Sequence, residues 1–259
     1  MAIILQYFLV ILFGYVAGVV VNFVSDWYYV RRQFLGEFTV NQLQEAGWVK
    51  YLAWPFSVRT VPQAHKVRVL LVELIYILLA FGLWFARPDR VQLWWGIPAL
   101  IYFGIVIVMD VEFRVVLHPI SIAGAILGAL VGIYLRGLWV TLLGGVVGFA
   151  VMFLLYKLGE IFMNWVNRRR DETINEVALG YGDVNMAGVV GLFLGWPPII
   201  LGLLFAIFTA GVVSILFIVI SLVIRRFRAF AAMPYAPFLA FAAIVMLFFP
   251  EQIAKLLGG

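Results

Sequence analysis

Carboxylates that lie within or beside apolar segments are the residues of this sequence best suited to chemistry. There are five of them: Glu73, Asp110, Glu112, Glu160 and Asp183. An ionisable side chain inside a membrane is energetically costly, so each is a candidate functional residue. Asp110 ends one apolar segment, in IVMDVEFR, and Asp183 opens another, in ALGYGDVNMAG. If both segment ends face the same side of a membrane, these two aspartates lie at the same depth.

A pair of aspartates has a definite chemistry. Two carboxylates close together in a partly dry site repel each other, so they cannot both be ionised easily and come to share one proton. One can then draw a proton from water while the other protonates the departing amine, as in aspartic proteases. That chemistry needs neither a metal nor a thiol. It fits a chain with no cysteine and only two histidines, His65 and His118.

The residues before Asp183 leave two interpretations open. Gly180 and Gly182 flank a tyrosine, and glycine allows backbone conformations and close approaches that other residues do not. Such a backbone is tolerated within a membrane where it lines a cavity or is covered by protein, which favours a functional site. Aspartate is also a common helix N-cap, and the local pattern fits that structural role equally well.

The elements that must position these residues are membrane helices. The chain has 259 residues, of which 65% are hydrophobic and 12% charged, and its mean hydropathy is +1.09. Soluble domains are about 45–50% apolar and about 25% charged, so a soluble enzyme is excluded, and so is a disordered chain. Continuous apolar runs such as LVELIYILLAFGLWF do not alternate as the strands of a β-barrel do. The sequence therefore predicts an all-α polytopic membrane protein.

About eight transmembrane helices are expected, because a span needs about 20 mostly apolar residues. The segments are Ala2–Val24, Val67–Phe85, Leu93–Met109, Pro119–Leu135, Gly137–Tyr156, Val184–Leu194, Pro198–Ile224 and Ala229–Phe249. The sixth is too short to cross alone, and in the fifth Gly144, Gly145 and Gly148 indicate a face for close helix packing. The implied domains are the first helix at 1–24, a cytoplasmic loop or small cap at 25–66, and a membrane core with the aspartates at 67–259.

The basic residues indicate the orientation. The formal net charge is +5, and an excess of Lys and Arg marks cytoplasmic loops. With the N-terminus outside, most of the 18 Lys and Arg residues fall inside, and the exceptions are Arg87, Arg90, Arg136 and Lys255. This orientation puts Asp110 and Asp183 together at the cytoplasmic face. Because the charge is a topology signal, no nucleic-acid partner is expected.

The motifs, taken in order, resemble those of the type IV prepilin peptidases, the GxGD class of membrane aspartic proteases. GYGDVNMAG is similar to the family's glycine-flanked second catalytic aspartate, which matches Asp183. MDVEFRVVLHP resembles the element of the first catalytic aspartate, which matches Asp110 and Pro119. Three less specific family elements, Arg-x-x-x-x-Glu-Leu, Pro-x-x-Pro-Phe-Leu and Gly-x-x-x-Asn, match Arg68, Glu73 and Leu74; Pro234, Pro237 and Phe238; and Gly18 and Asn22. The resemblance covers nearly the whole chain.

The chain also departs from the family pattern. Most members carry two Cys-x-x-Cys pairs that bind zinc in the first cytoplasmic loop; this chain has no cysteine, so no zinc is expected. In bifunctional members that loop is linked to N-methylation of the new pilin N-terminus with S-adenosylmethionine, so a methyltransferase activity stays open here. Ile120 stands where an aspartate is common, and Asn185 where a lysine usually follows the second aspartate. None of these departures removes a catalytic carboxylate.

The resemblance implies an endopeptidase of the bacterial cytoplasmic membrane that removes the basic leader of type IV prepilins or pseudopilins. Asp110 and Asp183 would be its catalytic pair, supported by the loop glycines Gly180 and Gly182. Cleavage would take place at the cytoplasmic face, in the service of a type IV pilus or of protein secretion. The expected partners are the prepilin and the lipid bilayer. Proteolysis would need no cofactor, S-adenosylmethionine stays open, and no oligomeric state is indicated.

Three further acidic residues fit more than one role. Glu73 fits a structural ion pair with a cation such as Arg68, which we favour, or a group that orients the aspartates or binds the leader. Glu112 fits a solvated or leader-binding group. Glu176 matches an acidic position often seen before the GxGD element, although a loop glutamate is usually only solvated.

An alternative from another class is a proton-coupled transporter or channel that uses Asp110 and Asp183 as a relay. Against it, no charged residue lies in the outer half of any well-defined span, so nothing visible would line an aqueous path. A third interpretation is a catalytically silent assembly subunit, in which either aspartate could be neutralised without loss.

Overall fold

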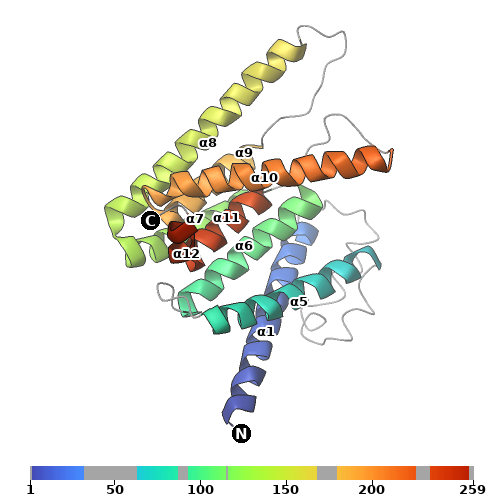
Figure 1. Ribbon diagram of the computed structural model, residues 1–259, viewed down its shortest axis with the longest axis vertical. Helices are drawn as coiled ribbons and strands as arrows, with labels where there is room; N and C mark the ends of the chain where they lie inside the picture. Colours follow the sequence, from blue (N-terminus) through green and yellow to red (C-terminus); the bar gives the residue numbers. More distant parts are fainter. Residues whose placement is uncertain are drawn as a thin grey trace. The chain divides into compact units, whose positions relative to one another are not determined.

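The computed structural model describes residues 2–31, 63–86, 93–114, 116–167, 180–225 and 234–256. Throughout these ranges the regular secondary structure is α-helical (Figure 1). The chain divides into two compact units, Met1–Val108 and Met109–Gly259. The division falls within helix α6 (Leu93–Phe113), so Asp110 and Asp183 belong to the same unit.

The first unit contains α1 (Ala2–Arg31), α5 (Gln63–Ala86) and the larger part of α6. The second unit contains the end of α6 and six further helices: α7 (His118–Arg136), α8 (Leu138–Asn167), α9 (Tyr181–Leu194), α10 (Pro198–Val223), α11 (Ala236–Phe248) and α12 (Pro250–Leu256). Each of the expected spans overlaps a helix. This confirms the prediction of an all-helical polytopic membrane protein.

Six of the described helices are long and apolar enough to cross a membrane: α1, α5, α6, α7, α8 and α10. The other two expected spans are shorter, with 14 residues in α9 and 13 in α11. That these two helices cross, and that the N-terminus lies outside, therefore stay predictions.

The helix ends differ from the expected spans in three places. Helix α1 continues to Arg31, and the rest of the expected loop or cap, residues 32–62, lies outside the described residues. Helix α8 continues past Tyr156, the expected end of the fifth span, to Asn167. Of the last expected span, Ala229–Phe249, residues 229–233 lie outside the described residues, and helix α11 begins only at Ala236, so the expected helix is wrong at Pro234 and Tyr235. Two prolines, Pro234 and Pro237, account for this late start, because proline favours the first turn of a helix over its interior.

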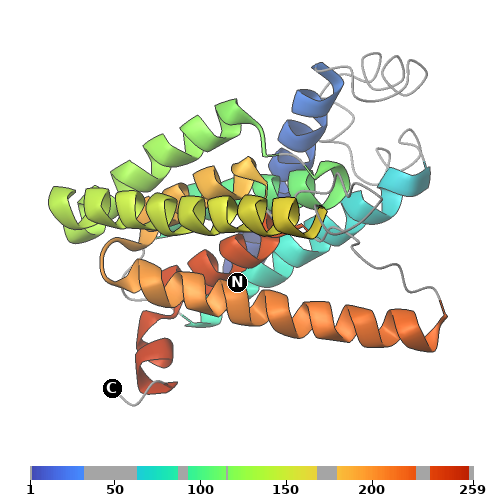
Figure 2. The ribbon, with the colours of Figure 1, turned by 90° about the horizontal axis from the view of Figure 1, so that it is seen from above.

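Helix α9 forms the centre of the second unit. It packs against α7, α8, α10 and α11, and most of its residues are buried. In Figure 2, α8 has α7 on one side and α10 on the other, with α9 partly hidden behind it. Helix α10, in contrast, buries only Ile199, Gly202, Leu203 and Ala206, all in its first half, and leaves most of its other apolar side chains exposed. An exposed apolar surface of this kind fits contact with lipid.

Glycines allow α8 and α9 to pack backbone to backbone. A β-carbon added to Gly144 would lie 2.4 Å from the carbonyl oxygen of Gly191, and one added to Gly191 would lie 2.1 Å from that of Gly144. A β-carbon on Gly148 would lie 2.4 Å from the carbonyl oxygen of Ala187. These approaches confirm the close-packing face predicted for the fifth span, and small residues serve the same purpose at many membrane helix interfaces.

We expect Gly144→Ala to lower the melting temperature of the detergent-solubilised protein by roughly 3–10 °C, because overpacking costs about 1–3 kcal/mol. The matched control is Gly211→Ala in α10, where an added β-carbon meets no atom within 4 Å. The control should leave the melting temperature unchanged or raise it slightly, since alanine favours helix more than glycine does. Equal melting temperatures for the two variants would contradict the glycine interface.

Candidate functional site

Asp110 lies in the last turn of α6 and is only 6% exposed. Its Oδ2 accepts a hydrogen bond from the backbone N–H of Ala236, at 3.1 Å. Ala236 is the first residue of α11, and the N–H groups of a first helical turn have no partner within the helix. The start of a helix also carries partial positive charge, which stabilises a carboxylate there. The positive charge of Arg114, one turn further along, also acts on Asp110.

Asp183 lies in the first turn of α9 and is 8% exposed. Its Oδ2 accepts a hydrogen bond from the backbone N–H of Gly180 at 3.2 Å, and its own N–H donates to the Gly180 carbonyl at 3.0 Å. Within the described part of the chain, its Oδ1 is buried and has no hydrogen-bond partner. Asp183 therefore closes the first turn of its helix with one oxygen, and the other oxygen is left for a further role.

The structure brings Asp110 and Asp183 together within the second unit. The two carboxylates lie close enough for the charge of Asp110 to act on Asp183, and the N–H of Ala236 faces both of them. The end of α6, the start of α9 and the start of α11 thus meet around two acidic groups. Such a pair can hold a water molecule and move a proton in either direction.

The two glycines before Asp183 serve different purposes. A β-carbon on Gly182 would lie 2.9 Å from the β-carbon of Val116, so glycine is needed there for a close approach to the segment before α7. Gly180 has a φ of −77°, which any residue can adopt, and neither glycine has a positive φ. The expectation of an unusual backbone conformation is therefore wrong for both positions, while the expected close approach is confirmed at Gly182.

The other acidic candidates of the second unit have different surroundings. Glu112 is half-buried in the last turn of α6, and Glu176 lies outside the described residues. Glu160 is exposed on α8 and pairs with Lys157 at 2.8 Å. Among the described residues, no group of three or more His, Cys, Asp or Glu side chains could hold a metal ion.

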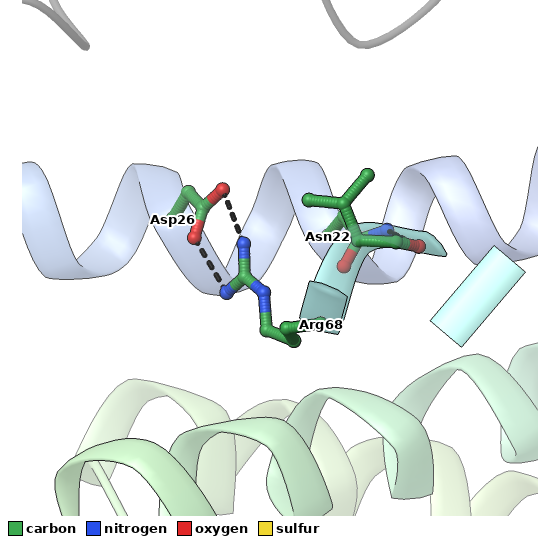
Figure 3. A network of polar contacts seen from close by, with 4 residues as sticks. Asn22, Asp26 and Arg68 are labelled. Atoms are coloured by element: carbon green, nitrogen blue, oxygen red, sulfur yellow. Dashed lines mark hydrogen bonds and ion pairs between the residues drawn. The ribbon is translucent and has the colours of Figure 1, made fainter. Parts of the chain in front are cut away.

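In the first unit, Arg68 forms a buried ion pair with Asp26 (Figure 3). Two guanidinium nitrogens reach the two carboxylate oxygens, at 2.7 and 2.8 Å. One turn earlier on α1, the Asn22 side chain donates a hydrogen bond to the backbone carbonyl of Val69 on α5. These contacts join α1 to α5 at the ends that flank the expected cytoplasmic loop.

The expected ion pair between Glu73 and Arg68 is wrong. Residues three or four apart face each other on a helix, and these two are five apart on α5. Glu73 instead faces Gly18 of α1, where an added β-carbon would lie 2.8 Å from the Glu73 Cα. Its side chain is only 5% exposed, and within the described residues it has no hydrogen-bond or ion-pair partner. Sequence reasoning missed Asp26 because it counted the residue as part of the loop.

Residues 97–215 match the model of the type IV leader peptidase family. This part of the chain is similar to the type IV leader peptidases. The match begins in α6, includes both Asp110 and Asp183, and ends within α10. It supports a leader peptidase with a prepilin-type substrate, as the motifs had indicated. No curated protein and no solved structure matches the chain.

The leader peptidase match ends before α11, so it does not include Ala236, whose N–H holds Asp110. The sequence identified this region only through the Pro-x-x-Pro-Phe-Leu element, one of the three less specific family elements. No periodicity or composition signals that a backbone N–H there would meet a carboxylate far back in the chain. The sequence could therefore indicate this region only through its motif, and not through the chemistry of its side chains.

For the ion pair of the first unit, we expect Arg68→Met to destabilise the protein strongly, by about 3–5 kcal/mol, because it leaves Asp26 buried without its cation. The double variant Asp26→Leu with Arg68→Met should recover much of that loss. Thermal unfolding in detergent measures both. Glu160→Gln is the control, since it breaks an exposed pair worth about 0–1 kcal/mol. A double variant less stable than Arg68→Met alone would show that the buried pair is not the main contribution of these residues.

Proposed function

We propose that this chain is a membrane aspartic endopeptidase that removes the leader peptide of type IV prepilins or pseudopilins. The observation that carries the proposal is the meeting of two buried carboxylates, Asp110 and Asp183, at the ends of two helices and beneath one shared backbone N–H. The family match supports a peptidase with a prepilin-type substrate. The catalytic type, the residues and the side of cleavage are the additional content of the proposal.

The chemistry requires a water molecule between the two carboxylates. One carboxylate takes a proton from the water as its oxygen bonds to the scissile carbonyl carbon, and the other donates a proton to the leaving nitrogen as the C–N bond breaks. Backbone N–H groups fix one oxygen of each aspartate, from Ala236 to Asp110 and from Gly180 to Asp183. The free Oδ1 of Asp183 is the atom best suited to hold the water.

Cleavage at the cytoplasmic face suits a substrate whose basic leader precedes an apolar helix. At the membrane boundary both water and extended substrate backbone are available, whereas in the bilayer centre the substrate helix would first have to unwind. The basic loops of the sequence support this orientation. We propose the bacterial cytoplasmic membrane as the site of action.

We expect Asp110→Asn and Asp183→Asn each to lower the rate of prepilin cleavage at least about a thousandfold, because an amide cannot exchange the catalytic proton. The assay is intact-mass analysis of a candidate prepilin incubated with the purified protein. Glu160→Gln, on the exposed part of α8, should cleave like the wild type. Full activity in either aspartate variant would overturn the proposal.

The same assay, run with S-adenosylmethionine, tests N-methylation. An added methyl mass on the cleaved pilin would assign this second activity to a chain without the zinc-binding cysteines, and an unmodified product would leave a peptidase alone. If the folded wild type cleaves no prepilin, the proton-coupled transporter becomes the stronger interpretation. Proton flux into liposomes that depends on Asp110 and Asp183 would then establish it.

The topology can be tested with single cysteines, since the chain has none of its own. Tyr181 and Trp196 flank α9 and are similarly exposed, at 46% and 43%. In right-side-out spheroplasts, a membrane-impermeant maleimide should label Trp196→Cys directly and Tyr181→Cys only after lysis. Labelling of both from one side would show that α9 does not cross, and the opposite order would place the carboxylates outside.

A further inference from the structure

Tyr235 lies directly before α11, next to the residue whose N–H holds Asp110. Its ring packs beside Phe238, with ring centroids 6.3 Å apart. Within the described residues, its hydroxyl oxygen is buried and has no hydrogen-bond partner. A buried polar group without a partner costs about 1–3 kcal/mol, so its presence calls for a compensating role.

A second buried oxygen without a partner lies nearby. The Oδ1 of Asp183 is buried and unpartnered among the described residues, and the charge of Asp183 acts on Tyr235. Among the described residues neither group hydrogen-bonds to the other. A hydroxyl that can donate and a carboxylate oxygen that can accept are therefore both left without a partner close to the carboxylate pair.

The hydroxyl of Tyr235 keeps its proton at neutral pH. Burial raises the pKa of Tyr235 to about 12, and the negative charge of Asp183 adds to the rise. The group is therefore a hydrogen-bond donor throughout the range in which a shared-proton aspartate pair can work. It is not a candidate to take a proton from water.

We propose that the hydroxyl of Tyr235 is a catalytic hydrogen-bond donor to the carbonyl oxygen of the scissile peptide bond. The inference rests on the proposed function and deepens it. When the oxygen of water bonds to the carbonyl carbon, an electron pair of the C=O bond moves onto the oxygen. Next to two acidic groups, this new negative charge is stabilised only by a donor. Tyr235 keeps its proton throughout, and the proton of the water goes to a carboxylate.

The two unpartnered atoms of Tyr235 and Asp183 fit this assignment. Water bound to Asp183 Oδ1 and a carbonyl bound to Tyr235 would satisfy both buried atoms at once. A donor that is fixed in place before the reaction stabilises the developing charge without further reorganisation. The packing of the ring beside Phe238 and the start of α11 at Ala236 provide that fixed position.

The test is Tyr235→Phe, which removes the hydroxyl and keeps the ring. We expect kcat for prepilin cleavage to fall about 10- to 100-fold with KM within twofold of the wild type, because the lost bond strengthens only as charge develops. The melting temperature should stay the same or rise, since an unpartnered buried hydroxyl is lost. Tyr156→Phe is the matched control, a half-buried aromatic residue of the same unit that packs beside Phe153, and it should retain the wild-type kcat.

A second measurement separates catalysis from a packing defect. A substrate peptide whose scissile carbonyl is replaced by a tetrahedral, hydroxyl-bearing carbon mimics the reacting state. Tyr235→Phe should weaken the binding of this mimic by about the same factor as it lowers kcat/KM. In an Asp183→Asn background, which leaves the prepilin uncleaved, Tyr235→Phe should leave the affinity for prepilin unchanged. An unchanged affinity for the mimic would overturn the inference, even if kcat falls.

The failure of this inference is distinguishable from failure of the proposed function. If Tyr235→Phe cleaves at the wild-type rate while both aspartate-to-asparagine variants are inactive, Tyr235 is structural and the protease proposal stands. A rise in KM at constant kcat would also overturn the inference, because the hydroxyl would then bind only the ground state. If the aspartate variants are active, the protease proposal itself fails, and Tyr235 loses its assigned role.

Discussion

The second unit depends on one constraint: two carboxylates are buried close together, and each needs a hydrogen-bond donor that does not neutralise it. Backbone N–H groups at helix starts meet this need, because they are unpaired within the helix and carry partial positive charge. Ala236 supplies such a donor to Asp110, and Gly180 supplies one to Asp183. Arg114 acts on Asp110 only through its charge, whereas an arginine that replaced these backbone donors would hold the carboxylates ionised. Neutral donors leave the pair able to share and exchange a proton, which its chemistry requires.

This constraint explains features of the helices that length and hydropathy alone do not. Helices α9 and α11 are short, and each begins at the carboxylates rather than passing them. A helix start must then be brought close to its neighbours. Gly182 allows the start of α9 to approach Val116, and the Gly144–Gly191 contact holds α9 against α8. These small residues thus fix the position of Asp183 relative to α8 and to the segment before α7.

Much of the helical fold followed from the sequence, because apolar length is a property of whole segments and tolerates local error. The juxtaposition of Asp110 and Asp183 followed from the same reasoning, since two segment ends on one face need no knowledge of packing. The partners of polar side chains did not follow. Arg68 pairs with Asp26 rather than Glu73, and this pairing depends on which face α1 turns toward α5. The donor from Ala236 left no trace in composition, because every residue other than proline has a backbone N–H.

The buried Glu73 shows how differently the two units treat a carboxylate. Asp110 and Asp183 receive backbone donors, whereas Glu73 lies against the backbone of α1 at Gly18 and has no partner among the described residues. Arg68, one turn away, is already held by both oxygens of Asp26. Within the described residues, the first unit therefore uses a side-chain ion pair to join two helices, whereas the second unit uses backbone donors to hold a pair of acids.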